Sequence, residues 1–139
     1  MKSILLTLWL TVLTVESAPI KVNLWPGTPS TNSEDNASIT AYLPDKDKAS
    51  AAGVIVVPGG SFLIRCEDHE GTQVAKWLTA RGIAAFVVHY RLIPRFTMRE
   101  ELDDVRRAVQ VVRSRSQEFG IQKIGVIGFS AGADRKSVV

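Results

Sequence analysis

The sequence contains a single cysteine, Cys66, only two histidines, and no block of like charge. A lone cysteine excludes an intrachain disulfide framework and a multi-cysteine zinc site. Charges of both signs are scattered along the chain, with 17 Lys and Arg, 14 Asp and Glu and a net charge of +3. Because no basic block stands out, we expect no nucleic-acid partner. With 139 residues, 45% of them hydrophobic, the chain has room for one globular domain. We expect no metal and no cofactor, and the pattern leaves the oligomeric state open.

The first 17 residues are typical of a secretory signal peptide. Lys2 precedes the uncharged apolar run Ile4–Val15, and the small residues Ser17 and Ala18 follow. The run is too short to span a bilayer, so we expect no stable membrane insertion after the signal is removed. A secreted or periplasmic protein cleaved after Ser17 is therefore predicted. The alternative is a buried amphipathic element at the N-terminus.

The last six residues, 134–139, differ in character from the rest. Their letters, D-R-K-S-V-V, match one reading frame of a common sequencing adapter that is followed by a stop codon. Our hypothesis is that this tail is not natural and that the authentic sequence reaches about Ala133. Residues 18–133 would then be part of a larger domain.

Three short apolar runs, 54–57, 83–88 and 124–127, are mostly β-branched and lack polar alternation. This pattern predicts strands that are buried on both faces of a parallel sheet. Apolar residues at helical spacing predict one helix over 70–81 and a second from Thr97 towards Gly120.

The second helix begins with Thr97 followed three residues later by Glu100, which predicts a capping box. Its charged residues are interpreted as a solvated helix surface with several pairs of opposite sign, and not as a carboxylate pair for acid–base work. These charged residues are Arg99, Glu101, Asp103, Asp104, Arg106, Arg107, Arg113 and Arg115.

Two further strands precede these elements. Residues 39–43 alternate enough to predict an antiparallel edge strand, and 22–25 form a candidate first strand. Two strands followed by alternating strand and helix imply an open α/β sheet with helices covering its faces.

The most informative motif is G-x-S-x-G, formed by Gly128, Ser130 and Gly132 directly after the third buried run. Glycines at both ends allow a sharp bend from strand to helix that lifts the Ser130 hydroxyl clear of the sheet. The amide of Ala131 would point at an oxygen that becomes negative during acyl transfer. The alternative is a glycine-rich loop of a nucleotide-binding fold, although the G-x-G-x-x-G and phosphate-loop patterns are missing.

A second glycine-rich segment, Pro58–Phe62, follows the first buried run, at the same end of the sheet if the strands are parallel. Two glycines allow main-chain amides to approach a ligand closely. We interpret Gly60 and Ser61 as the other donors of an oxyanion hole that includes Ala131. The alternative is an ordinary Gly-Gly turn.

Together, these motifs resemble the N-terminal half of an α/β-hydrolase. The shared segments are P-G-G-S-F, D-H-E-G at 68–71, H-Y-R-L at 89–92, D-D-V-R-R-A-V in the second helix, and G-F-S-A-G-A. The resemblance is to the bacterial acetyl-esterase and lipase type, and within it to the xylan-associated feruloyl and acetyl esterase branch, over about residues 20–133. It implies a mostly parallel sheet with antiparallel first strands, cut off after the serine. Pro58 and Ser61 depart from the H-G-G-G of related lipases.

In the family that these motifs resemble, the three catalytic residues follow one another along the chain in the order Ser, Asp or Glu, and His. The histidine, which is the general base, therefore comes after the serine. Here the only histidines, His69 and His89, precede Ser130. We assign His69 a local structural role, and His89 a place at the rim of the site but no triad role. Without a base the Ser130 hydroxyl is a poor nucleophile, so we expect this fragment to be inactive.

Three functions are consistent with these residues. The first is a secreted serine carboxylesterase, which the resemblance suggests acts on short acyl esters of carbohydrates or small alcohols. The second is a serine peptidase of the same fold. The third is a non-catalytic α/β-hydrolase-like binding protein that has kept the serine bend.

Overall fold

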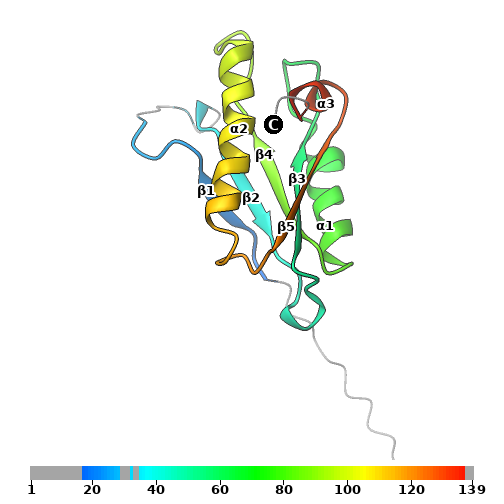
Figure 1. Ribbon diagram of the computed structural model, residues 1–139. Helices are drawn as coiled ribbons and strands as arrows, with labels where there is room; N and C mark the ends of the chain where they lie inside the picture. Colours follow the sequence, from blue (N-terminus) through cyan, green and yellow to red (C-terminus); the bar gives the residue numbers. More distant parts are fainter. Residues whose placement is uncertain (1–16, 29–31, 33–34, 137–139) are drawn as a thin grey trace, which may run out of the picture.

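The computed structural model describes residues 17–28, 32 and 35–136, so the expected signal peptide up to residue 16 and positions 137–139 of the expected tail lie outside the described residues. Figure 1 shows the arrangement of the elements. In chain order they are β1 (Ile20–Asn23), β2 (Ser38–Tyr42), η2 (Lys46–Lys48), β3 (Ala52–Val57), η3 (Asp68–Thr72), α1 (Gln73–Thr79), β4 (Ala84–His89), α2 (Met98–Ser114), β5 (Lys123–Gly128) and α3 (Ala131–Lys136).

The strands form one mixed sheet in the order β1-β2-β4-β3-β5. The β1–β2 and β2–β4 pairs are antiparallel, whereas β3 pairs in parallel with both β4 and β5. The predicted α/β class and the antiparallel first strands are therefore confirmed. The expectation that 39–43 forms an edge strand is wrong, because β2 lies between β1 and β4 and pairs with both.

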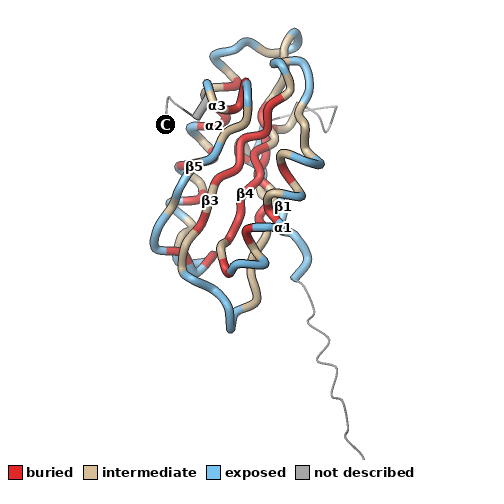
Figure 2. The backbone as a smooth tube through the Cα atoms, turned by 90° about the vertical axis from the view of Figure 1, so that its right-hand side faces the viewer, coloured by how far each residue is buried: buried red, intermediate tan, exposed pale blue. Residues whose placement is uncertain are grey.

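Two helices cover opposite faces of this sheet (Figures 1 and 2). On one face, Ile55 and Phe86 pack with Val105 of α2 in the larger core cluster. On the other face, Val56 and Val87 pack with Ala75 of α1 in a smaller cluster. Because successive residues of a strand point to opposite faces, β3 and β4 are buried on both sides, as predicted.

Strand β5 is less buried than the apolar run at 124–127 predicts. Its residues alternate between exposed and partly buried, and Ile127 is 38% exposed. Among the described residues β5 pairs only with β3, so it lies at the edge of the sheet. The prediction of burial on both faces is therefore wrong for this strand.

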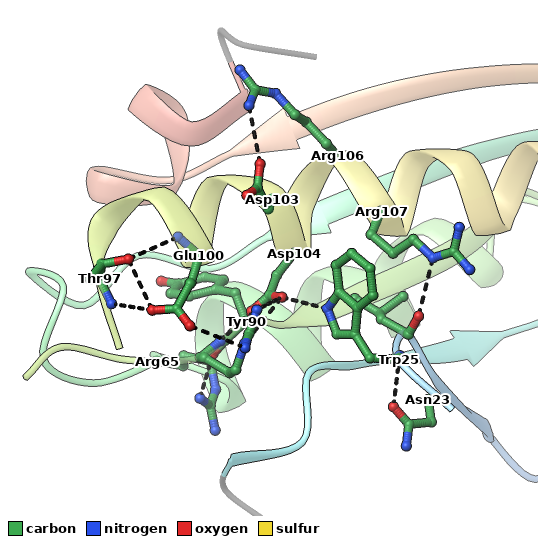
Figure 3. A network of polar contacts seen from close by, with 12 residues as sticks. Asn23, Trp25, Arg65, Tyr90, Thr97, Glu100, Asp103, Asp104, Arg106 and Arg107 are labelled. Carbon is green, nitrogen blue, oxygen red and sulfur yellow. Dashed lines mark hydrogen bonds and ion pairs between the residues drawn. The ribbon is translucent and has the colours of Figure 1, made fainter. Parts of the chain in front are cut away.

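Helix α2 begins with the predicted capping box. The Glu100 amide donates to Thr97 Oγ1 at 3.3 Å, and the Thr97 amide donates to Glu100 Oε2 at 2.8 Å (Figure 3). However, two charges that were assigned to the solvated surface of this helix, Glu101 and Asp104, are fully buried. The expectation of a uniformly solvated charged face is wrong at these two positions.

Asp104 is buried because it is the centre of a polar network. Its Oδ1 accepts hydrogen bonds from Trp25 Nε1 and Arg91 Nη2, both at 2.7 Å, and its Oδ2 accepts one from the Arg91 amide at 3.0 Å. A buried carboxylate is tolerated only when its oxygens are paired in this way. The network fixes the segment after β1 onto α2, where Arg107 Nε also donates to the Leu24 carbonyl at 3.1 Å (Figure 3).

We predict that Asp104→Ala lowers the free energy of unfolding by about 3 kcal/mol, because it leaves the Trp25 N–H without its acceptor and the Arg91 guanidinium with the more distant Glu100 carboxylate, 3.6 Å away. Urea unfolding followed by circular dichroism measures this change. The matched control is Asp103→Ala, which removes a neighbouring carboxylate that is 44% exposed and forms an ion pair with the surface Arg106. That control should change stability by less than about 0.5 kcal/mol. Equal losses in the two variants would contradict the prediction.

Candidate active site

Ser130 lies on a sharp bend between β5 and α3. Its φ of +48° is in the left-handed region, which costs a residue with a side chain about 1 kcal/mol or more. The bend is closed by the Gly132 amide, which donates to the Phe129 carbonyl at 2.7 Å. The serine is exposed, as the motif predicts for a residue lifted clear of the sheet.

The two glycines of the motif are required by close backbone contacts. A Cβ on Gly128 would lie 2.4 Å from the Gly132 carbonyl oxygen. A Cβ on Gly132 would lie 2.2 Å from the carbonyl oxygen of Val57, at the end of β3. No side chain fits at either position without moving the main chain, so the pattern G-x-S-x-G reflects the geometry of this bend.

The Gly-rich segment after β3 lies beside this bend, at the same end of the sheet (Figure 1). In the parallel register Val57 pairs with Gly128, so the two strands end together. A Cβ on Gly59 would lie 3.1 Å from Ser130 Cβ and 2.6 Å from the Phe129 carbonyl oxygen. The segment and the serine are therefore direct neighbours. Their chemical roles stay a prediction.

The chain after Gly59 curls into a tight loop. Gly60 has φ +140°, and Ser61 and Phe62 follow with φ +53° and +69°. The amides of Leu63 and Ile64 both donate to the Gly60 carbonyl at 3.1 Å. Gly60 is needed here because a Cβ would lie 2.1 Å from the Ile64 carbonyl oxygen. Within the described part of the chain, the amides of Gly60 and Ser61 have no hydrogen-bond acceptor.

Side chains to which the sequence assigns no role hold this loop. The buried Tyr90 donates its hydroxyl to the Pro58 carbonyl at 2.7 Å, and Arg65 Nη1 donates to the Tyr90 carbonyl at 2.7 Å. Glu70 Oε2 accepts the Gly59 amide at 2.8 Å. The available signals were a tyrosine directly after a buried strand and acidic residues directly after a glycine-rich loop.

His89 belongs to a chain of hydrogen bonds that Arg65 connects to this loop. Its Nδ1 lies 2.8 Å from Glu67 Oε1, and its Nε2 lies 2.8 Å from Thr40 Oγ1 on β2. Burial opposes the charge of Glu67, but the hydrogen bonds from His89 and Arg65 outweigh it and lower the pKa of Glu67 to about 2. Both ring nitrogens of His89 are thus engaged away from Ser130.

His69 does not contact Ser130 either. It is exposed on η3 and lines a largely apolar cavity of about 730 Å³ between α1 and the edge of the sheet. Neither Ser130 nor residues 59–61 line this cavity. No described residue forms a hydrogen bond to the Ser130 hydroxyl, so the described part of the chain holds the serine without a general base.

The described residues include no group of three or more His, Cys, Asp or Glu side chains that could hold a metal ion. No helix in the same residues is both long and apolar enough to cross a membrane.

Known proteins share both the sequence and the fold. Residues 39–138 match the model of the BD-FAE family. The chain is 34% identical over 108 residues to the acetylxylan esterase of Xylanibacter ruminicola, an alignment that covers 76% of this chain and 22% of that protein. It is 32% identical over 101 residues to endo-1,4-beta-xylanase B of Butyrivibrio fibrisolvens, covering 69% of this chain and 16% of that protein.

A solved structure also shares the fold of this chain. The acetyl ester-xyloside bifunctional hydrolase of Caldicellulosiruptor lactoaceticus superposes with a TM-score of 0.75 at 34% identity, over 86% of this chain and 45% of that one. The resemblance inferred from the motifs, to an α/β-hydrolase of the esterase type, is confirmed by these likenesses. The chain spans less than half the length of each of these relatives.

We predict that the Glu67–His89 pair makes stability depend on pH in the acid range. The pKa of Glu67 is about 2 in the folded protein against an ordinary 4.5, so its stabilising contribution is complete above pH 4.5 and is lost as the pH falls towards 2. Thermal melting of the wild type should therefore fall more steeply between pH 4.5 and 2 than melting of Glu67→Gln.

The control for this measurement is Asp47→Asn. Asp47 is exposed on η2 and forms no ion pair among the described residues, so its removal should leave the slope unchanged. Parallel pH profiles of the wild type and Glu67→Gln would contradict the prediction.

Proposed function

This chain belongs to the BD-FAE family, and on that premise we propose that the whole protein is a secreted serine carboxylesterase in which Ser130 is the nucleophile. The observation that carries the proposal is the strained Ser130 on its glycine-flanked bend, next to Gly59 at the start of a glycine-rich loop. Such a bend is the geometry that exposes a nucleophilic hydroxyl above the sheet of an α/β-hydrolase.

In the proposed reaction, Ser130 Oγ attacks the ester carbonyl carbon and its proton passes to a base. The carbonyl oxygen becomes negative in the tetrahedral intermediate and is stabilised by the amides of Gly60, Ser61 and Ala131. Collapse of the intermediate breaks the bond to the alcohol, which leaves with a proton. Water then hydrolyses the acyl-serine by the same steps in reverse order.

The base is the part of this machinery that the described residues (17–28, 32 and 35–136) do not supply, since neither His69 nor His89 is hydrogen-bonded to Ser130. A serine hydroxyl without a base is a weak nucleophile at neutral pH. We therefore expect this chain on its own to hydrolyse esters poorly, and the whole protein to provide a histidine and the acid that orients it.

We propose short acyl esters on carbohydrate as the substrates. Two relatives with 34% identity support this choice, one named an acetylxylan esterase and the other an acetyl ester-xyloside bifunctional hydrolase. The family match over residues 39–138 includes the proposed nucleophile region.

We predict that Ser130→Ala lowers kcat/KM of the purified whole protein for p-nitrophenyl acetate by at least about a thousandfold, because it removes the nucleophile. Release of p-nitrophenol measures the rate. The matched control is Ser114→Ala, which removes an exposed hydroxyl at the end of α2 and should leave the rate unchanged. An active Ser130→Ala variant would overturn the proposal, and faster cleavage of a peptide p-nitroanilide than of the ester would favour a peptidase.

Secretion is a further part of this proposal and rests on residues 1–17. We predict that signal peptidase removes them, so that the mature protein begins at Ala18. N-terminal sequencing of protein purified from the culture medium or the periplasm tests this. A protein that retains Met1 and the apolar run would contradict it.

A further inference from the structure

We propose that Glu70 is a positioning residue for the ester hydrolysis proposed above, on which this inference rests. Its carboxylate holds the Gly59 amide and so fixes the orientation of the loop at 58–66, which carries the Gly60 and Ser61 amides. Neither the family match nor the motifs assign a role to this residue.

Glu70 and Ser130 both lie close to Gly59. The position that a Cβ would take on Gly59 is 3.0 Å from Glu70 Oε2 and 3.1 Å from Ser130 Cβ. The hydrogen bond from the Gly59 amide to Glu70 Oε2 is 2.8 Å long. The carboxylate therefore acts directly beside the proposed nucleophile and not at the outer end of the loop.

Glu70 and Tyr90 bind the same peptide group, one at its N–H and the other at its carbonyl. The peptide between Pro58 and Gly59 has its carbonyl bound by the Tyr90 hydroxyl at 2.7 Å and its N–H bound by Glu70. Because a peptide group is planar, contacts at both edges leave it little freedom to rotate. Pro58 adds to this restriction, since its ring fixes φ.

In the next peptide group, between Gly59 and Gly60, the carbonyl is hydrogen-bonded, whereas the N–H has no acceptor among the described residues. The Gly59 carbonyl accepts a hydrogen bond from the Cys66 amide at 2.9 Å. In a trans peptide the C=O and N–H point in opposite directions, so this bond directs the Gly60 N–H away from Cys66. The Gly60 amide has no acceptor in the described residues, which leaves it available to a ligand. Loss of the Glu70 contact would free the preceding peptide and, with it, the direction of this donor.

A carboxylate is a strong acceptor for a main-chain amide, because its charge strengthens the bond. That charge also has a cost for the proposed reaction, since it lies close to the place where a second negative charge develops. A neutral acceptor of the same shape should therefore preserve the positioning effect. This distinguishes a positioning role from a role that requires the charge itself.

The experiment compares kcat and KM for p-nitrophenyl acetate in the whole protein and in three variants. Glu70→Ala removes the acceptor and should lower kcat about tenfold to a hundredfold, with KM changed by less than about threefold, because a misdirected donor weakens transition-state binding. Glu70→Gln keeps an acceptor oxygen and should restore kcat to within about threefold of the wild type. The matched control is Asp68→Ala, which removes the exposed carboxylate two residues earlier, bonded only to Gln73 among the described residues, and should leave both constants unchanged.

A second measurement does not depend on catalysis. In ¹H–¹⁵N spectra, the Gly59 amide should exchange slowly with deuterium in the wild type and in Ser130→Ala alike, because Glu70 Oε2 binds it. The same amide should exchange faster in Glu70→Ala, whereas Glu70→Gln should keep the protection.

The outcomes separate this inference from the proposed function. If Ser130→Ala is inactive while Glu70→Ala keeps the wild-type kcat, the inference is wrong and the proposed function stands. If Ser130→Ala keeps its activity, the proposed function is wrong and the inference fails with it. A loss in Glu70→Ala that Glu70→Gln does not restore, and that accompanies a matching loss of thermal stability, also overturns the positioning role.

Discussion

The approach of two main chains at the ends of β3 and β5 is the constraint on which the site depends. The Val57 carbonyl oxygen accepts the Phe129 amide at 3.1 Å and lies where a Cβ on Gly132 would be only 2.2 Å away. The bend that carries Ser130 forms only if the backbone comes this close, and only glycine permits it. The parallel pairing of β3 with β5 supplies the approach, so the sheet register and the exposed serine are parts of one geometric condition.

The proposed chemistry needs two different kinds of group around Ser130. Stabilising an oxyanion needs donors that are already oriented, and main-chain amides held by the fold meet that need without moving. Transferring a proton needs a titrating side chain in contact with the serine hydroxyl. Around Ser130 the described residues place the main-chain amides that we propose as the first kind of group. None of the described titrating side chains is hydrogen-bonded to the Ser130 hydroxyl, and His89 is engaged by Glu67 and Thr40.

Much of the fold could be predicted from the sequence because it follows from local patterns. The sequence correctly predicts the buried strands β3 and β4 and the capping box at Thr97. Burial on two faces and helix capping both depend on residues that are close together in the sequence. The failures concern contacts between distant segments. Asp104 looks like one more surface charge in its helix, because the Trp25 that binds it lies 79 residues away. The placement of β2 inside the sheet likewise depends on its two partners and not on its own alternation.

The difference between local patterns and contacts of distant segments also explains which parts of the candidate site could be predicted from the sequence. Gly128 and Gly132 are visible in the pattern because each stands where the main chain has no room for a side chain. Glu70 and Tyr90 stand inside two of the shared segments, but the sequence does not reveal their contacts with the loop, because each depends on a hydrogen bond to a residue far along the chain. A motif of this kind therefore reports where the backbone is strained, whereas the groups that hold the strained backbone in place emerge only from the contacts of the folded chain. The oxyanion donors that we propose are all main-chain amides, so those holding groups are the side chains through which the proposed site can be changed.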